Sequence, residues 1–245
     1  SSLENGAPPS GSGLSRALCL YDNAGEHFQP RNQSSASVAT NHLALSKCLL
    51  FLFDPLQHPK FRLKCQTFST DPQIEAGRTM KNHRQDEILM EAAKRIRQRV
   101  NLGSDEKIKV PLIVVVNKYD VWGKLLPHLD LNAYRLFGRG PQNCSGINTD
   151  AIDEVSAKIK GLLKELTPEF VAVCNNFSDD VTYVPASPLG CSPEVDQTRE
   201  GDATLGVRPG KINPIWAEVP LLFALVKSKT GLLQAMRISK KTSET

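Results

Sequence analysis

Residues 109–120 read KVPLIVVVNKYD, an apolar run that ends in Asn-Lys-Tyr-Asp. β-branched residues dominate the run, and this composition predicts a strand buried inside a sheet. An aspartate just beyond such a strand can accept hydrogen bonds from the N1–H and the exocyclic NH₂ of guanine. Adenine presents no such pair of donors on that edge, so a site built in this way discriminates between the two bases. The stretch therefore favours an α/β sheet with a nucleotide site at the strand ends.

The rest of the chain alternates between strand-like and helix-like stretches. Apolar runs predict further strands at 16–22, 48–55 and 181–187, the second of them buried on both faces. Amphipathic stretches predict helices at 38–47, 85–100, 150–167 and 213–228. This alternation is typical of a mostly parallel sheet with helices on both faces.

One domain is expected over residues 16–228. Residues 1–15 are rich in Ser, Gly and Pro, which predicts a flexible leader, and residues 229–245 are expected to form a polar tail. Three stretches without clear periodicity are expected to be insertions within the domain, at about 55–80, 121–150 and 191–211.

Composition excludes several classes of protein. The longest apolar runs fall far below the roughly 20 residues that a membrane helix needs, so no membrane span is expected. The net charge of +4 is mild, and nucleic acid is not indicated as a partner. The six cysteines include no C-x-x-C pair, so a zinc site is not expected, and a reducing, cytoplasmic setting is the simplest interpretation. The basic residues of the 85–100 helix are expected to form a solvated outer face.

Two other predicted strands end in residues suited to a nucleotide. Asp22-Asn-Ala-Gly25 follows the strand at 16–22, and Ser187-Pro188-Leu189 lies at the end of the strand at 181–187. A plain turn accounts for either motif alone, because Asp, Asn, Gly and Pro are common turn residues. Functional loops of parallel sheets, however, gather at the carboxyl ends of the strands, where these stretches would meet Asn117-Lys118-x-Asp120.

In this order, each behind a strand, the stretches resemble the third, fourth and fifth motifs of guanine-nucleotide-binding domains of small GTPases and translation factors. Over about residues 16–228 the chain is more closely similar to the bacterial double-GTPase family, in the segments YDNAGEHF, LLFLFDP, TDPQ, VPLIVVVNKYDVW and NPIWAEVPLL. Members of that family are predicted GTPases of multidomain bacterial proteins, some linked to conflict or defence systems. The resemblance implies a GTP-dependent switch that binds GTP or GDP with Mg²⁺ and acts on a protein effector or on adjoining domains of the same polypeptide.

The resemblance also implies roles for particular residues. Asp22 would hold Mg²⁺ through water, and the Gly25 N–H would sense the γ-phosphate. The guanine base would be bound by Asn117, Lys118, Asp120, Ser187 and Leu189. Asp54 also ends an apolar run and is the other candidate for the metal-binding acid, but Pro55 follows it and has no N–H for a phosphate.

The chain departs from the family pattern in its catalytic and base-binding loops. Glu26 stands where many small GTPases have a water-orienting Gln, so hydrolysis without a partner is expected to be slow. His27 is the other catalytic candidate, since translation-type relatives use a histidine there, although a loop histidine without catalytic duty is the favoured interpretation. Pro188 has no N–H to offer guanine O6, so Leu189, or a shifted register, must supply it.

The sequence contains no G-x-x-x-x-G-K-[ST] motif, and GVRPGKI at 206–212 has the wrong spacing. The expected fold is therefore a three-layer P-loop NTPase sheet that lacks its N-terminal strand–P-loop–helix unit. The place of that strand, between 16–22 and 48–54, is expected to be vacant or closed by direct pairing of the two strands. Alone, the chain is not expected to bind Mg·GTP tightly. The alternative is a non-hydrolysing pseudo-GTPase that serves as an interaction module.

Overall fold

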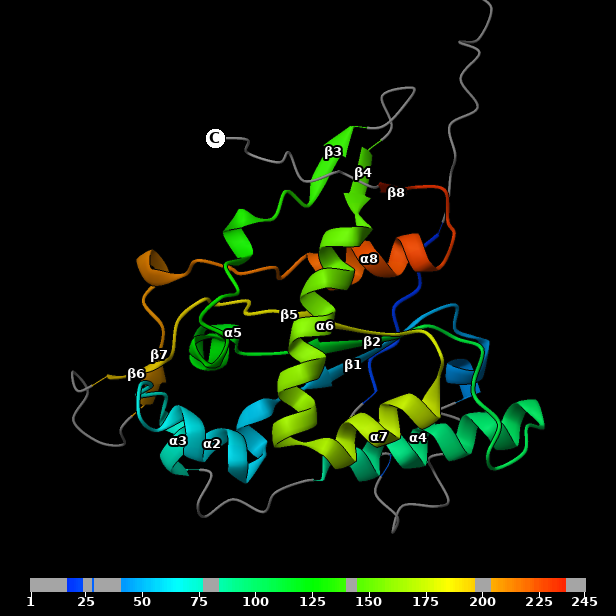
Figure 1. The fold of residues 1–245 in the computed structure, drawn as a ribbon, viewed down its shortest axis with the longest axis horizontal. Coiled ribbons are helices and arrows are strands. Elements are labelled where there is room, and N and C mark those ends of the chain that lie inside the picture. The colour runs from blue at the N-terminus through cyan, green and yellow to red at the C-terminus, as the bar shows by residue number, and fades with distance from the viewer. Residues whose placement is uncertain are drawn as a thin grey trace, which may run out of the picture.

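The computed structural model describes residues 17–23, 28, 41–76, 84–139, 145–196 and 204–236. Its centre is a parallel sheet of three strands in the order β1-β2-β5 (Figure 1). The strands comprise Leu49–Phe53 (β1), Leu112–Val116 (β2) and Val181–Pro185 (β5). The strands predicted around residues 48–55, 109–120 and 181–187 are therefore confirmed, with β2 in the middle.

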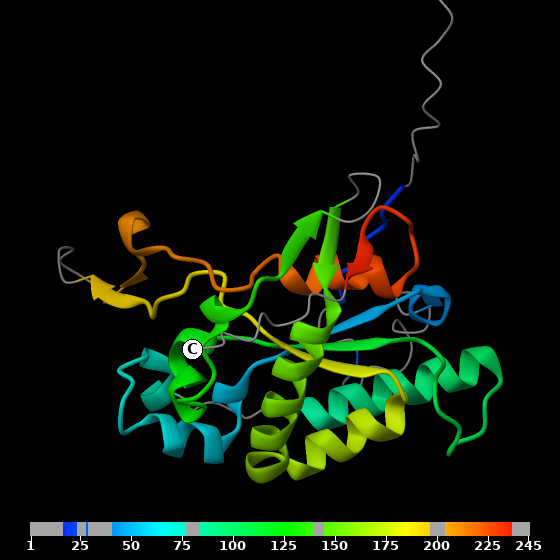
Figure 2. The ribbon, with the colours of Figure 1, turned by 45° about the horizontal axis from the view of Figure 1, so that its top comes forward.

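Helices cover both faces of this sheet, as the alternation predicts. Leu112, Val114 and Val116 point into a core shared with the helices α4 (Gln85–Val100), α6 (Thr149–Leu166) and α7 (Pro168–Phe177). Ile113 and Val115 point into a smaller core on the other face, shared with α8 (Val219–Lys227). Figures 1 and 2 show α8 on the opposite side of the sheet from α4 and α7. All five residues of β2 are buried for this reason.

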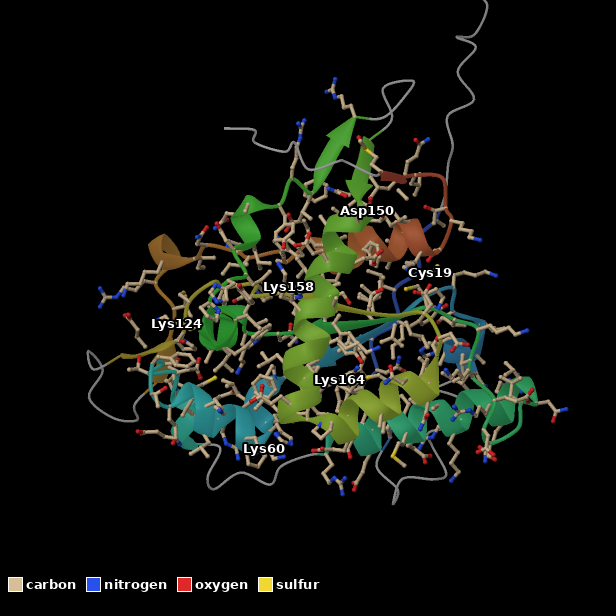
Figure 3. The ribbon with its side chains drawn as sticks, viewed as in Figure 1. Cys19, Lys60, Lys124, Asp150, Lys158 and Lys164 are labelled. Carbon is tan, nitrogen blue, oxygen red and sulfur yellow. The ribbon has the colours of Figure 1, made fainter. Side chains whose placement is uncertain are left out.

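The two longest helices agree with their sequence periodicity. The helix predicted at 85–100 is α4, and the one predicted at 150–167 is α6, which begins one residue earlier. The Asn148 side chain caps α6 by accepting a hydrogen bond from the Ala151 N–H at 3.3 Å. Asp150 and Lys164 mark the two ends of α6, which crosses in front of the sheet (Figure 3).

The basic face of α4 is not simply solvated. The Arg97 guanidinium donates hydrogen bonds to the carbonyls of Glu106 and Asn176, both at 2.7 Å, and Arg95 pairs with Glu91 at 2.8 Å. Arg97 thereby holds α4 to the end of α7. It has a structural role, whereas the sequence predicted only a solvated outer face.

The prediction of a strand at 16–22 is wrong for the described residues 17–22. This segment has no regular secondary structure, and Leu18, Leu20 and Tyr21 are exposed. A strand needs a hydrogen-bonded neighbour, and in the described part of the chain β1 pairs with β2 alone. The segment instead contacts the 3₁₀ helix η2 (Asn41–Leu45), where the Tyr21 ring stacks on His42 at a centroid distance of 4.3 Å. Direct pairing of residues 17–22 with β1 is therefore excluded. Of the helix predicted at 38–47, the described residues 41–47 contain only this short 3₁₀ turn.

Among the described strands β1 lies at an edge of the sheet, and the expectation that both of its faces are buried is wrong. Leu50 and Leu52 are 38% and 65% exposed. The Leu49 N–H donates to the Pro111 carbonyl, and the Phe53 carbonyl accepts from the Asn117 N–H, both at 2.9 Å. Because alternate residues of a parallel strand bond to the same neighbour, the main-chain groups of Leu50 and Leu52 face the other way, toward the open edge.

A cavity of about 440 Å³ lies along this open edge. One wall is β1, another is α4, and Tyr21, Asp22 and Asn23 contribute to the lining. At the carboxyl end of the strand, Gln85 closes the edge. Its carboxamide accepts the Asp54 N–H at 2.8 Å and donates to the Asp54 carbonyl at 2.9 Å. A side chain there does what a neighbouring strand would otherwise do.

The stretches expected to be irregular insertions contain short elements. Residues 55–80 hold η3 (Pro55–Gln57), α2 (Pro59–Cys65) and α3 (Pro72–Ala76). The stretch 121–150 holds the second half of α5 (Tyr119–Trp122), then η4 (Gly123–Leu125), η5 (Leu131–Ala133), β3 (Phe137–Arg139) and β4 (Ser145–Asn148). The third holds the β6–β7 hairpin (Glu194–Asp196 and Thr204–Gly206) and η7 (Pro209–Lys211). None of these is long enough to show a period.

The C-terminal part also differs from its prediction. The closing helix begins at Val219 rather than at 213, so Pro220 lies in its first turn, where a missing N–H breaks no helical bond. Within the predicted polar tail, β8 (Gln234–Met236) pairs with β4 and completes a small mixed sheet, β3-β4-β8.

No helix in the described ranges combines the length and the apolar character needed to cross a membrane. The five described cysteines are free thiols, and Cys65 and Cys174 are buried.

Candidate functional site

The carboxyl ends of β2 and β5 bring together two residues that lie 67 positions apart. The Ser187 hydroxyl donates a hydrogen bond to Oδ1 of Asp120 at 2.5 Å and accepts one from the Gly190 N–H at 2.9 Å. Ser187 is buried, with 3% of its surface exposed, whereas Asp120 is half-buried. Asp120 makes no other hydrogen bond or ion pair within the described ranges, so its second oxygen remains a free acceptor.

The loop after β5 is locked against the segment that precedes α8. Ser187 and Ile215 exchange two main-chain hydrogen bonds of 2.8 Å, and the Asn213 N–H donates to the Leu189 carbonyl at 2.9 Å. Gly190 has a left-handed φ of +66°, and a Cβ there would lie 1.7 Å from the Asn213 oxygen. Only glycine fits this turn, so the backbone of residues 187–190 has one defined path.

That path leaves one main-chain donor available. Pro188 has no N–H, and the Leu189 N–H makes no hydrogen bond to any described residue. The Leu189 side chain is 39% exposed, so the donor lies near the surface of the loop. The Leu189 N–H is thus available as a donor in place of the one that Pro188 lacks.

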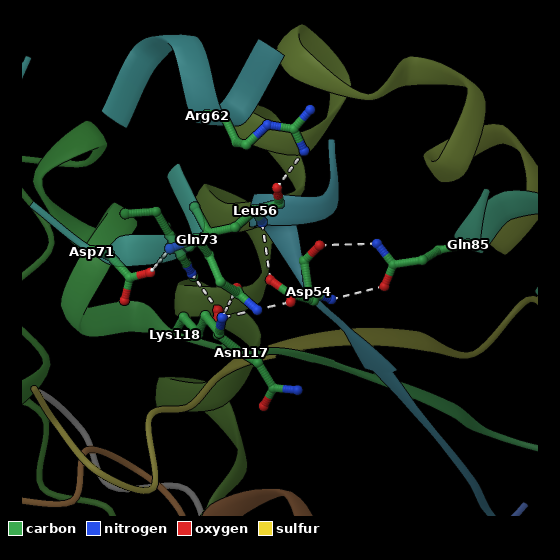
Figure 4. A network of polar contacts seen from close by, with 9 residues as sticks. Asp54, Leu56, Arg62, Asp71, Gln73, Gln85, Asn117 and Lys118 are labelled. Carbon is green, nitrogen blue, oxygen red and sulfur yellow. Dashed lines mark hydrogen bonds and ion pairs between the residues drawn. The ribbon is translucent and has the colours of Figure 1, made fainter. Parts of the chain in front are cut away.

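The loop after β2 is held by its main chain. The Asn117 N–H bonds to β1 as described above, its carbonyl accepts from the Trp122 indole at 2.7 Å, and the Tyr119 N–H donates to Ala186 at 3.2 Å. The Asn117 side chain takes no part in these described contacts. Its carboxamide forms no hydrogen bond within the described residues and points away from the nearby polar network (Figure 4). The backbone holds the loop instead.

Tyr119 fixes the far side of the same loop. Its hydroxyl donates to the Leu129 carbonyl at 2.9 Å, and burial together with Asp130 raises its pKa. The phenol therefore stays neutral and keeps this hydrogen bond over a wide pH range.

Lys118 adopts a left-handed conformation, with φ 60° and ψ 42°. A non-glycine residue in this region carries backbone strain, and such residues cluster at functional sites. Its Nζ contacts Oε1 of Gln73 and lies 3.7 Å from Oδ2 of Asp54 (Figure 4). The lysine thus joins the end of β2 to the end of β1 and to α3.

The Lys118 network extends to further residues, among them Asp54, which the sequence offered only as an alternative metal-binding acid. The Asp54 carboxylate also accepts the Leu56 N–H at 3.0 Å, and the Gln73 N–H donates to Asp71 at 2.9 Å. Asp54, Gln73 and Gln85 are therefore its additional members. The segments LLFLFDP and TDPQ, which carry part of the family resemblance, were the available signal for the first two.

The third motif is not brought to this cluster. Asp22 is exposed, lines the cavity beside β1 and makes no polar contact with any other described residue. Gly25, Glu26 and His27 lie outside the residues that the structure describes. In the described ranges, no group of three or more His, Cys, Asp and Glu side chains could hold a metal ion.

Comparison of the chain with protein-family models, with curated proteins and with solved structures finds no match. What the site can do is therefore inferred from its own geometry and chemistry.

Proposed function

We propose that the ends of β2 and β5 form the guanine-binding half of a nucleotide site, in a GTP-dependent switch domain of the P-loop GTPase type. The observation that carries the proposal is the Asp120–Ser187 pair. A carboxylate is acceptor-only when ionised, and its two oxygens offer more acceptor positions than Ser187 uses. Asp120 is therefore held in place with acceptor capacity to spare.

The available groups match the hydrogen-bonding edge of guanine. Guanine presents one acceptor, O6, beside two donors, N1–H and the exocyclic NH₂. The Leu189 N–H is a donor for O6, and the Asp120 carboxylate accepts from the other two groups. Adenine presents a donor where guanine has O6 and an acceptor where guanine has N1–H, so it would leave Asp120 and Leu189 unpaired. Sites of this kind reject the wrong partner strongly, because unpaired polar groups are costly.

The described residues fit the base better than they fit the phosphates and the metal. Asp22 is the one described residue of the third motif that could act on Mg²⁺, and among the described residues no cluster of metal ligands surrounds it. When bound, Mg²⁺ and the triphosphate would supply the reactive phosphoryl group. Asp22, Gly25, Glu26 and His27 remain the residues proposed to act there.

The open edge of β1 is where a further strand would complete the sheet. The main chain of Leu50 and Leu52, which pairs with no described strand, faces the cavity, and Asp22 lies in its lining. We infer that the strand of a strand–P-loop–helix unit would occupy this position. Under this proposal the chain alone binds the guanine base weakly and Mg·GTP poorly, and the complete protein acts on an effector or on adjoining domains, as the similarity to double-GTPases implies.

The test is selectivity for the base, because the base half is the part that the chain contains. Nuclear magnetic resonance titrations with guanosine, adenosine and xanthosine should show shifts at residues 117–120 and 187–190 for guanosine alone. Asp120→Asn should weaken guanosine binding by about 1–3 kcal/mol and favour xanthosine binding, because the amide reverses one donor–acceptor pairing. Asp105→Asn, an exposed aspartate in a distant loop, is the matched control.

Equal responses to guanosine and adenosine, or unchanged guanosine binding by Asp120→Asn, would remove Asp120 from the base site. Single-turnover phosphate release by the complete protein, with Glu26→Gln alongside, separates a slow GTPase from the non-hydrolysing interaction module.

A further inference from the structure

A second hollow lies at the amino ends of the three central strands, at the opposite end of the sheet from Asp120. It has a volume of about 740 Å³. Lys47 precedes β1, Lys109 precedes β2 and Asp180 precedes β5, so residues far apart in the sequence meet around it. Lys227 and Lys229, at the end of α8, complete its basic lining.

The charges around this hollow are unevenly compensated. The lining of the hollow contains four lysines but two acidic residues, Asp153 and Asp180. Lys227 pairs with Asp180 at 2.6 Å and lies over the Phe223 ring at 5.3 Å. The other three, Lys47, Lys109 and Lys229, are exposed and form no hydrogen bond or ion pair with any described residue. Three ammonium groups are therefore available to a ligand.

Apolar surface lies between these lysines. Pro111, before β2, and Val226, on α8, are partly exposed and line the same hollow. The first turn of α6 also contributes to the lining through Thr149, and the positive end of a helix dipole favours anions. A ligand that fits this surface carries several negative charges spaced along its length and apolar groups between them. A peptide rich in Asp and Glu with an interspersed apolar side chain has this chemistry.

We propose that the lysine-lined hollow docks an acidic peptide segment of a partner protein. Its charge complements the three free lysines, and its apolar side chains cover Pro111 and Val226. Asp153 works against such a partner. Burial, Asp150 and Asp180 raise the pKa of Asp153, so a further negative charge beside it is unfavourable. The surface is separate from the nucleotide site, so this proposal stands or falls independently of guanine binding.

The experiment measures fluorescence anisotropy with a labelled peptide of alternating Asp and Glu and one central Phe, at about 0.1 M salt, where exposed charges still interact over roughly 10 Å. Lys109→Glu should weaken binding about two- to tenfold, and Lys47→Glu with Lys109→Glu by about tenfold or more. Asp153→Asn should strengthen it about two- to fivefold. Lys164→Glu, an equal charge change at the other end of α6 (Figure 3), is the control and should leave binding unchanged.

Four outcomes would overturn the proposal. These are the absence of saturable binding, equal binding of an Asn/Gln version of the peptide, an equal loss with Lys164→Glu, and tighter binding of an oligonucleotide or tripolyphosphate with the same dependence on Lys109. The last would assign the hollow to a phosphorylated ligand. Misfolding could not produce the gain in binding expected from Asp153→Asn.

Discussion

Replacing Ser187 by Ala should lower the free energy of unfolding by about 2–4 kcal/mol, because a neutral hydrogen bond contributes about 0.5–1.5 kcal/mol and one to a charged group about 1.5–3 kcal/mol. The Ser187 hydroxyl makes one of each kind, to the Gly190 N–H at 2.9 Å and to the Asp120 carboxylate at 2.5 Å. The residue is 3% exposed, so water cannot readily replace either bond. Urea unfolding followed by tryptophan fluorescence gives the loss as a lower midpoint at unchanged slope.

Ser178→Ala is the matched control. Ser178 is equally buried, but its hydroxyl accepts a single neutral hydrogen bond, from the Asp180 main-chain N–H at 3.2 Å. Ser178→Ala is therefore expected to lower the free energy of unfolding by about 1 kcal/mol. A double-mutant cycle of Ser187→Ala with Asp120→Asn should give a coupling free energy of about 1–2 kcal/mol. A Ser187→Ala loss no larger than that of Ser178→Ala, or strict additivity in the cycle, would refute the inference that Ser187 holds Asp120 in place.

Gly190→Ala should destabilise the chain by about 2 kcal/mol or more in thermal unfolding, because its Cβ would meet the Asn213 oxygen in a left-handed turn. Gly210→Ala, which has open space around it, should stay within about 0.5 kcal/mol of the parent, and similar losses at both positions would contradict the geometry. The pKa of Glu169 is lowered by a hydrogen bond from its own main chain and by His58. The Glu169 charge therefore stabilises the native state at neutral pH, and this stabilisation is lost as the pH falls through the folded-state pKa. Unfolding free energies measured across pH should therefore show Glu169→Gln less stable than the parent at pH 7 and equal to it in strong acid, and a gap independent of pH would contradict this.

The parts of the fold that the sequence predicted are those with a strong local signal. β2 is covered on both faces, so its five residues are uniformly apolar, and α4 and α6 are long enough for their period to be clear. The meeting of Asp120 and Ser187 followed from topology, because parallel strands present their carboxyl ends at one edge of the sheet.

The features that were missed depend on contacts rather than on local sequence. The run at 16–22 has the composition of a strand, yet no described strand pairs with it. The exposure of Leu52 follows from the edge position of β1, which its apolar sequence does not reveal. The partners of Lys118 come from β1 and α3, and no spacing rule relates Asp54 and Gln73 to it. α7 was missed because it follows directly on α6, with Pro168 as its first residue.

The central position of β2 has a consequence for how the chain folds. Neither of its neighbours can reach it through a short hairpin, because both pairings are parallel and each needs a long crossover that contains helices. The sheet therefore cannot start from a local turn. The entropy cost of closing two long loops must be overcome before strand pairing stabilises the structure. Folding dominated by such distant contacts is intrinsically slow. Helices α4 and α6, whose contacts are local, would then form ahead of the sheet that they cover.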